Sequence, residues 1–228
     1  MVLAASLLIV ASASGTAQSS KLDEAIDRSN RIWYELPEVA TTLSLADVTK
    51  SLSIREARRR GSAHMQIRVN GGLTQEVFDD RTRATILYHE TKTYRDSESG
   101  PRTPYQELPV LTENRFDLRW DSTHGLILRA RPALSIVRDE RAARVADTTY
   151  RRLTARFRQR RTRDQEGQSI ELRVLIDATG LVRRVEGEAE TDGNGKLTFL
   201  FVCDPKVPSD EPFTYDVTKL VGWKKVEG

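Results

Sequence analysis

The sequence predicts a mainly β protein with a few helices (α+β), built as one curved antiparallel sheet with a helix packed against it. Apolar and polar residues alternate in short segments about ten residues apart, which is typical of strands in a meander. Polar turn sequences such as Asn70-Gly71-Gly72 separate these segments. Helical spacing of apolar residues is clear in an early segment, and no linker-like stretch divides the 228 residues into two domains.

Composition excludes several classes of protein. Hydrophobic residues make up 38% of the chain and charged residues 30%, which excludes a multispan membrane protein, and the single cysteine excludes a disulfide scaffold. The 36 Lys and Arg against 33 Asp and Glu give a net charge of +3, too balanced for a polybasic nucleic-acid binder. Most of the basic residues are arginines that alternate with apolar residues, so we interpret them as a solvated outer sheet face. Contact with anionic lipid headgroups or with an acidic protein partner stays open as an alternative.

The N-terminus has the pattern of a secretory signal peptide. Residues 1–20 carry no charged side chain, and Leu3 to Ala13 form an almost unbroken apolar run of 11 residues. A membrane-spanning helix needs about 20 residues, whereas this length suits a signal-peptide core. We expect a signal over residues 1–17, cleaved after Ala13 or Ala17, and a soluble periplasmic protein with no transmembrane span after cleavage. No Lys or Arg precedes the apolar run, which fits a start further upstream, and a buried N-terminal helix or strand is the alternative.

Residues 21–36 predict an amphipathic helix that ends at Pro37. Its apolar face includes Leu22, Ile26 and Trp33 and is large enough to dock on the sheet. Strands are predicted over residues 63–69, 73–78 and 84–88, followed by a Pro-containing loop over residues 97–109.

The secondary-structure signal is ambiguous in the middle of the chain and strong after residue 150. Residues 116–120 predict a strand, residues 126–137 fit a strand or a helix, and residues 138–146 are rich in helix formers. Strong alternation then returns, and it predicts strands over residues 152–158, 170–176, 181–185 and 197–203.

No set of residues in the sequence predicts catalysis. His64, His89 and His124 stand on separate elements without metal-ligand spacing, and we expect each at the surface. We interpret Asp79-Asp80 as a turn, residues 121–124 as a loop between strands, and Cys203 as a packing residue. We therefore expect neither an enzyme nor a cofactor nor a metal site.

Several segments together resemble the outer-membrane lipoprotein carrier LolA and its relatives, the lipoprotein-sorting proteins. They are the export signal, the helix after it, Gln75 to Asp80, Leu172 to Glu186, and Leu197 to Phe201 with Pro212-Phe213. The resemblance implies that residues 18–228 form one domain, a half-open barrel with a helical lid over an apolar cavity. It implies a carrier that chaperones lipoprotein acyl chains during transport, and an arginine that holds the lid closed. Arg55 and Arg68 are among the arginines that could match.

The function expected from this resemblance is an exported envelope protein that binds lipid or lipoprotein acyl chains without chemistry. Each buried methylene of such a chain contributes about 0.8 kcal/mol, so partial burial suffices. The alternative is a regulatory or scaffolding envelope protein that binds a peptide or protein partner. For each candidate lining residue named next, packing as part of the core is the alternative to ligand contact. The candidate lining residues are Trp33, Met65, Ile67, Val69, Val77, Ile86, Ile170, Leu172, Val174, Leu181, Phe199 and Phe201.

Overall fold

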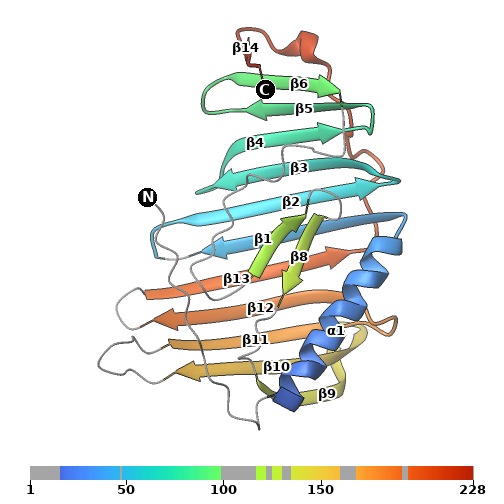
Figure 1. Cartoon of the computed structure of the whole chain (residues 1–228), viewed down its shortest axis with the longest axis vertical. Helices are drawn as coiled ribbons and strands as arrows, with labels where there is room; N and C mark the ends of the chain where they lie inside the picture. Colours follow the sequence, from blue (N-terminus) through green and yellow to red (C-terminus); the bar gives the residue numbers. More distant parts are fainter. Residues whose placement is uncertain are drawn as a thin grey trace.

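A computed structural model of the chain describes residues 16–46, 48–98, 117–121, 125–129, 135–159, 168–191 and 195–227. Within these ranges twelve strands form one open, curved sheet, and one helix lies across it (Figure 1). The mainly β class with a packed helix is therefore confirmed. The elements of the first half are α1 (Thr16–Glu35), β1 (Glu38–Ala46), β2 (Ser51–Arg59), β3 (Ser62–Val69), β4 (Gly72–Asp79), β5 (Arg83–Tyr88) and β6 (Thr93–Glu98). Those of the second half are β7 (Asp117–Asp121), β8 (Gly125–Arg129), β9 (Ser135–Val145), β10 (Thr148–Gln159), β11 (Gln168–Ile176), β12 (Val182–Thr191), β13 (Gly195–Asp204), the short 3₁₀ helix η2 (Val217–Lys219) and β14 (Lys224–Lys225).

The sheet consists of two antiparallel meanders that meet at a central seam. Strands β1 to β6 pair in chain order, and so do β9 to β13. The seam is the antiparallel pairing of β1 with β13, which sets Leu43 opposite Phe201. Strands β7 and β8 form a separate hairpin. No described strand pairs with the outer edge of β9, so within the described residues the sheet does not close into a barrel.

Local sequence determines the tight turns. Asn70 and Gly71 both have positive φ, 49° and 80°, as the predicted two-residue hairpin turn between β3 and β4 requires. Between β11 and β12, the Asp177 carboxylate accepts hydrogen bonds from the backbone N–H groups of Thr179 and Leu181, at 2.9 and 3.1 Å. Gly180 has φ +97° in this turn, a value that residues with a side chain rarely adopt.

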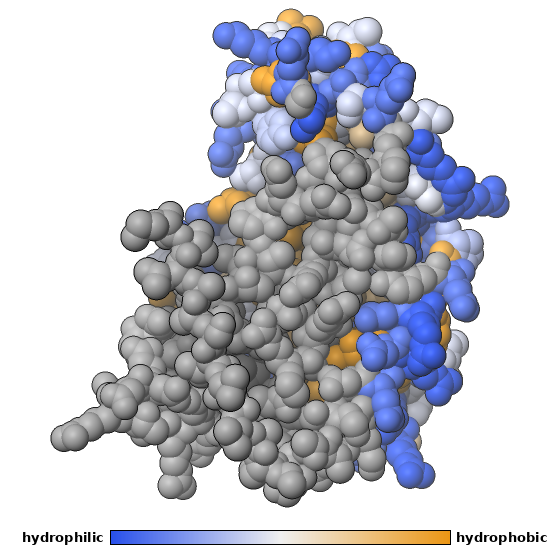
Figure 2. Space-filling model, in the orientation of Figure 1, coloured by the Kyte–Doolittle hydropathy of each residue, from blue (hydrophilic) through white to orange (hydrophobic). Residues whose placement is uncertain are grey.

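Helix α1 packs one side against the sheet and turns the other side to solvent. Leu22, Ile26 and Trp33 are 1–5% exposed, at the spacing that the sequence predicted. Glu24 and Asp27 on its other side are exposed. Figure 2 shows a hydrophilic band at the lower right, where α1 lies in Figure 1. The helix starts at Thr16, five residues before the predicted start at 21 and within the expected signal segment. We call the face of the sheet that α1 covers the inner face, and the opposite face the outer face.

Residues 138–146 are rich in helix formers, which left their structure open in the sequence, and residues 135–145 form strand β9. The segment pairs with β10 along most of its length. Arg151 binds the Asp139 carboxylate at 2.8 and 2.9 Å, and Arg152 lies 3.3 Å from that of Glu140. Strand pairing and these cross-strand ion pairs outweigh the weak helical preference of the segment.

After β13 the chain leaves the sheet and crosses its outer face as a largely irregular segment that includes η2, residues 205–227, which we call the C-terminal strap. It runs past the ends of the upper strands at the right of Figure 1 and ends in β14, at the opposite edge of the first meander. There β14 pairs in parallel with β6, because the N–H groups of Lys224 and Val226 donate to the carbonyls of Lys92 and Tyr94 at 3.0 and 2.8 Å. The strap therefore covers the edge of β6 at Thr93 and Tyr94.

Candidate functional site

The inner face carries two neighbouring clusters of buried apolar residues. One cluster lies under α1 and across the seam, and a second lies on β3, β4 and β5. Leu52 and Ile54 of β2 pack against both clusters and join them. Ten of the twelve predicted lining residues belong to these clusters. Trp33, Leu172, Val174, Leu181, Phe199 and Phe201 lie in the first, and Met65, Ile67, Val77 and Ile86 in the second.

Two predicted lining residues stand apart from the clusters. Val69, at the end of β3, is 40% exposed and does not line this surface. The side chain of Ile170 lies outside what the structure describes. Alternation along the strands therefore predicted which residues point to the inner face. It did not predict which of them, such as Val69, lie at a strand end outside the buried clusters.

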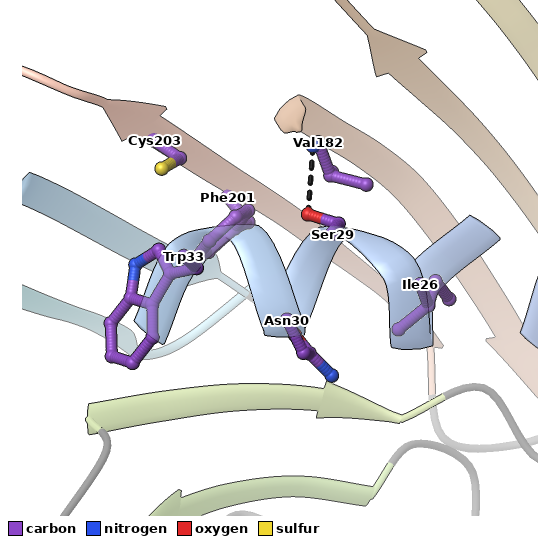
Figure 3. A pocket seen from close by; sticks show the side chains of 7 residues that line it. All are labelled: Ile26, Ser29, Asn30, Trp33, Val182, Phe201 and Cys203. Atoms are coloured by element: carbon purple, nitrogen blue, oxygen red, sulfur yellow. Dashed lines mark hydrogen bonds between the residues drawn. The ribbon is translucent and has the colours of Figure 1, made fainter. Parts of the chain in front are cut away.

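Helix α1 fills the space over the first cluster almost completely. A cavity of about 20 Å³ remains between helix and sheet, lined by Ile26, Ser29, Asn30, Trp33, Val182, Phe201 and Cys203 (Figure 3). Such a volume holds about one water molecule and no acyl chain. In this conformation the predicted lining residues under α1 therefore pack as core.

Polar contacts at two positions fix α1 on the sheet. The buried Ser29 hydroxyl accepts a hydrogen bond of 2.8 Å from the backbone N–H of Val182, drawn in Figure 3. Near the end of the helix, Arg58 donates to the Trp33 carbonyl at 3.0 Å, and its guanidinium carbon lies 3.9 Å from the Trp33 ring centroid.

Arg55 and Arg68, which could match the lid arginine of the LolA family, make no described contact with α1. Arg55 binds Glu211 of the C-terminal strap, on the outer face, and Arg68 is exposed. Arg58 was missed because it stands in a run of three arginines that we interpreted as solvated. Alternation from Ile54 would have placed it on the inner face.

Cys203 packs under α1, as the sequence predicted. It is 1% exposed, and burial raises the pKa of its thiol to about 12. A thiol with so high a pKa is not a nucleophile at neutral pH.

The prediction that His64 lies at the surface is wrong. It is 3% exposed, under the C-terminal strap on the outer face. Its Nδ1 lies 2.5 Å from Glu211 and its Nε2 2.9 Å from Glu76, and its ring stacks on Phe78 at 4.5 Å between centroids. Arg55 binds both oxygens of Glu211, and Gln66 donates to Glu76 at 2.8 Å. We call Arg55, His64, Gln66, Glu76 and Glu211 the His64 cluster.

Both carboxylates of the His64 cluster are stabilised in their charged form. Burial raises the pKa of Glu76, yet hydrogen bonds from His64 and Gln66 outweigh burial and leave that pKa below its usual value. The pKa of Glu211 is lowered in the same way, with burial opposed by Arg55 and His64. No signal in the local sequence joins Glu211 to His64, because the two lie on segments far apart in the chain.

Exposed basic residues on the outer face form ion pairs both between neighbouring strands and within one strand. Arg156 and Arg173 both contact Glu171, at 2.7 and 3.1 Å, and the hydrogen bond from Arg156 is the largest cause that lowers the pKa of that carboxyl. Lys196 likewise pairs with Glu188 at 2.7 Å. This pairing fits the solvated outer face that the sequence predicted.

Over the described ranges no group of three or more His, Cys, Asp or Glu residues could hold a metal ion. No helix within them has the length and apolar character needed to cross a membrane. His124 and most of the loop expected at residues 121–124 lie outside the described residues. Residues 1–15 of the expected signal peptide also lie outside them. The expectation that the protein is not an enzyme stays a prediction.

Comparisons with known proteins add little to this description. No family model matches the sequence, and no curated protein sequence matches it. Among solved structures, the chain is similar to one in the complex of Pseudomonas aeruginosa MucA and MucB, with a TM-score of 0.40 and 15% sequence identity. The match covers 86% of this chain and spans 62% of that chain. A TM-score this low establishes neither a shared fold nor a shared activity.

Proposed function

We propose that the protein is an exported, LolA-like envelope carrier that binds lipid or lipoprotein acyl chains on its inner face, without chemistry. The observation that carries the proposal is the pair of neighbouring apolar clusters on the inner face of an open sheet, with a single amphipathic helix over the first cluster. In this reading the sheet is the half-open barrel and α1 is its lid.

The acyl chain and α1 compete for the same surface. Leu22, Ile26 and Trp33 occupy it in the present conformation, and the remaining cavity is too small for a ligand. An acyl chain gains about 0.8 kcal/mol for each buried methylene, so a chain of ordinary length can offset the lost burial of three side chains. Binding then displaces the helix, and the return of the helix releases the ligand.

The Ser29 contact adds to the cost of displacing the lid. Because the Val182 N–H is buried, removing the hydroxyl leaves this donor without its acceptor and destabilises the closed form. A ligand that needs the open form then binds more tightly, since less free energy is spent on opening.

The first test is mass spectrometry of the mature protein, purified gently from an exporting bacterial host and extracted with solvent. We expect lipid or acyl species in stoichiometric amount. An empty protein that also fails to bind an apolar fluorescent probe would contradict the proposal. That result would favour a regulatory or scaffolding envelope protein whose inner face takes a peptide or protein partner.

The second test is the affinity of Ser29→Ala for a fluorescent fatty acid. Loss of one buried hydrogen bond of about 1 kcal/mol predicts roughly fivefold tighter binding. Glu24→Ala, an exposed change on the same helix, is the control and should bind as the unaltered protein does. Weaker binding by Ser29→Ala would show that α1 supplies contacts to the ligand and is not displaced by it.

A further inference from the structure

The C-terminal strap is attached to the outer face at a series of separate contacts. Arg59 donates to the carbonyls of Val207 and Pro208 at 3.0 and 2.8 Å. Phe78 contacts Tyr215, with ring centroids 5.0 Å apart. Near the end of the strap, His89 meets Trp223 at 5.3 Å, just before β14 pairs with β6. Between these contacts, the carboxylate of Glu211 enters the His64 cluster and has a side chain only 4% exposed.

The geometry of this buried contact depends on the protonation state of His64. Each ring nitrogen faces a carboxylate oxygen, Nδ1 that of Glu211 and Nε2 that of Glu76. A carboxylate only accepts hydrogen bonds, so both nitrogens can donate only when the ring is an imidazolium. A neutral ring would turn a lone pair toward one of two buried carboxylates.

The formal charge of the His64 cluster is zero only when His64 is protonated. Glu76 on β4 and Glu211 on the strap contact the ring, and Arg55 on β2 contacts Glu211, so an imidazolium gives two positive and two negative charges. His89, in the turn after β5, lies 3.5 Å from the other oxygen of Glu76, and Asp210 acts on Arg55. Loss of the His64 proton leaves two carboxylates in a buried site beside one guanidinium, which costs far more than an exposed pair would.

We propose that His64 is a proton-dependent clasp for the C-terminal strap: the imidazolium holds Glu211 on the sheet, and loss of its proton loosens the strap and uncovers the edge of β6. The strap is held most firmly where His64 is protonated and both carboxylates are ionised. It loosens at higher pH through His64 and at low pH through Glu76 and Glu211. Release leaves the backbone groups of β6 free to pair with another extended chain.

Amide hydrogen exchange at the end of the strap tests the clasp in the full chain. The Lys224 and Val226 amides, which bond to β6, report strap opening, and amides of β1 and β13 serve as the reference. An NMR titration of the His64 ring in the same sample gives the pH interval over which the ring loses its proton. Over that interval we expect the protection of Lys224 and Val226, corrected for intrinsic rates, to fall roughly ten- to a hundredfold relative to the reference.

Two variants assign the effect to His64. His89→Gln removes the neighbouring imidazole and should keep the pH-dependent step, whereas His64→Gln should abolish it. A step that persists in His64→Gln would overturn the proposal. The proposal would also be overturned if, in the unaltered protein, the protection of Lys224 and Val226 relative to the reference amides did not change while His64 loses its proton. This comparison does not depend on the folding of any variant.

Discussion

Gly187 shows how closely the inner face is packed at the scale of single residues. It lies on β12 opposite Phe199 of β13 and Leu172 of β11. A Cβ atom at this position would lie 2.2 Å from the Phe199 ring and 2.6 Å from a Leu172 methyl. The absence of a side chain therefore lets these two residues approach the backbone of β12.

Gly187→Ala should destabilise the fold, because both neighbours must shift within a packed core. We expect a loss of about 1–3 kcal/mol in the free energy of unfolding, measured by urea denaturation. Gly72→Ala is the matched control, since its nearest atom, the Val69 carbonyl, lies at an ordinary 3.5 Å and no positive φ is required. Equal stability of the two variants would contradict the packing argument.

Alternation along strands predicted most inner-face residues, because one buried face imposes a period of two on the sequence. It could not predict the His64 cluster. His64 and Gln66 point to the outer face, and a polar residue there normally meets solvent. What buries His64 is the strap, whose Glu211 lies far along the chain. Arg58 shows the opposite error, since its arginine neighbours concealed its position on the inner face.

At the scale of elements, α1 acts as the cover of Cys203. The thiol lies in the small cavity beneath the helix, together with Ser29 and Trp33. Its burial and its pKa of about 12 both slow reaction with thiol reagents while the helix is in place. The labelling rate therefore measures how often α1 leaves the sheet.

Ser29→Ala should speed the labelling of Cys203 by roughly fivefold under native conditions, because the lost hydrogen bond favours opening by about 1 kcal/mol. The rate is followed with a chromogenic disulfide reagent, and Glu24→Ala serves as the control on the exposed side of the helix. Identical rates in the two variants would mean that the thiol is reached by a route other than helix opening.

Among the elements, the local sequence pattern could not predict strand β9 or the central seam. The segment over residues 138–146 contains good helix formers, yet pairing with β10 determines its structure. Pairing of β1 with β13 joins strands from opposite ends of the chain. Alternation predicted β13, but no strand was predicted over β1, and no local pattern in either segment indicates that the two strands pair.

At the scale of the whole molecule, several carboxylates make stability depend on pH. Glu76, Glu211 and Asp96 all have lowered pKa values. For Glu76 and Glu211, burial is outweighed by hydrogen bonds, and for Asp96 the bond from the exposed Arg83 is the largest cause. A carboxyl whose pKa is lower in the folded state stabilises the fold above its unfolded pKa, and this contribution is lost as pH falls through the folded value.

The urea midpoint should therefore fall as the pH is lowered from about 6 to about 3, the range in which carboxyls titrate. Glu211→Gln should be less stable than the unaltered protein near neutral pH and should lose less on acidification. Glu24→Gln, an exposed change, should keep the full pH dependence. A Glu211→Gln curve parallel to that of the unaltered protein would exclude Glu211 as a source of acid sensitivity.

The seam between β1 and β13 also bears on when the molecule can fold. Strand β1 is made early, but its partner is complete only at Asp204, near the end of the chain. Contacts between such distant segments form late and slow the folding of a domain. When the chain is synthesised or exported N-terminus first, one edge of β1 therefore stays unpaired until β13 has also emerged. A holdase that covers this edge during delivery would protect the chain when it is most prone to aggregate.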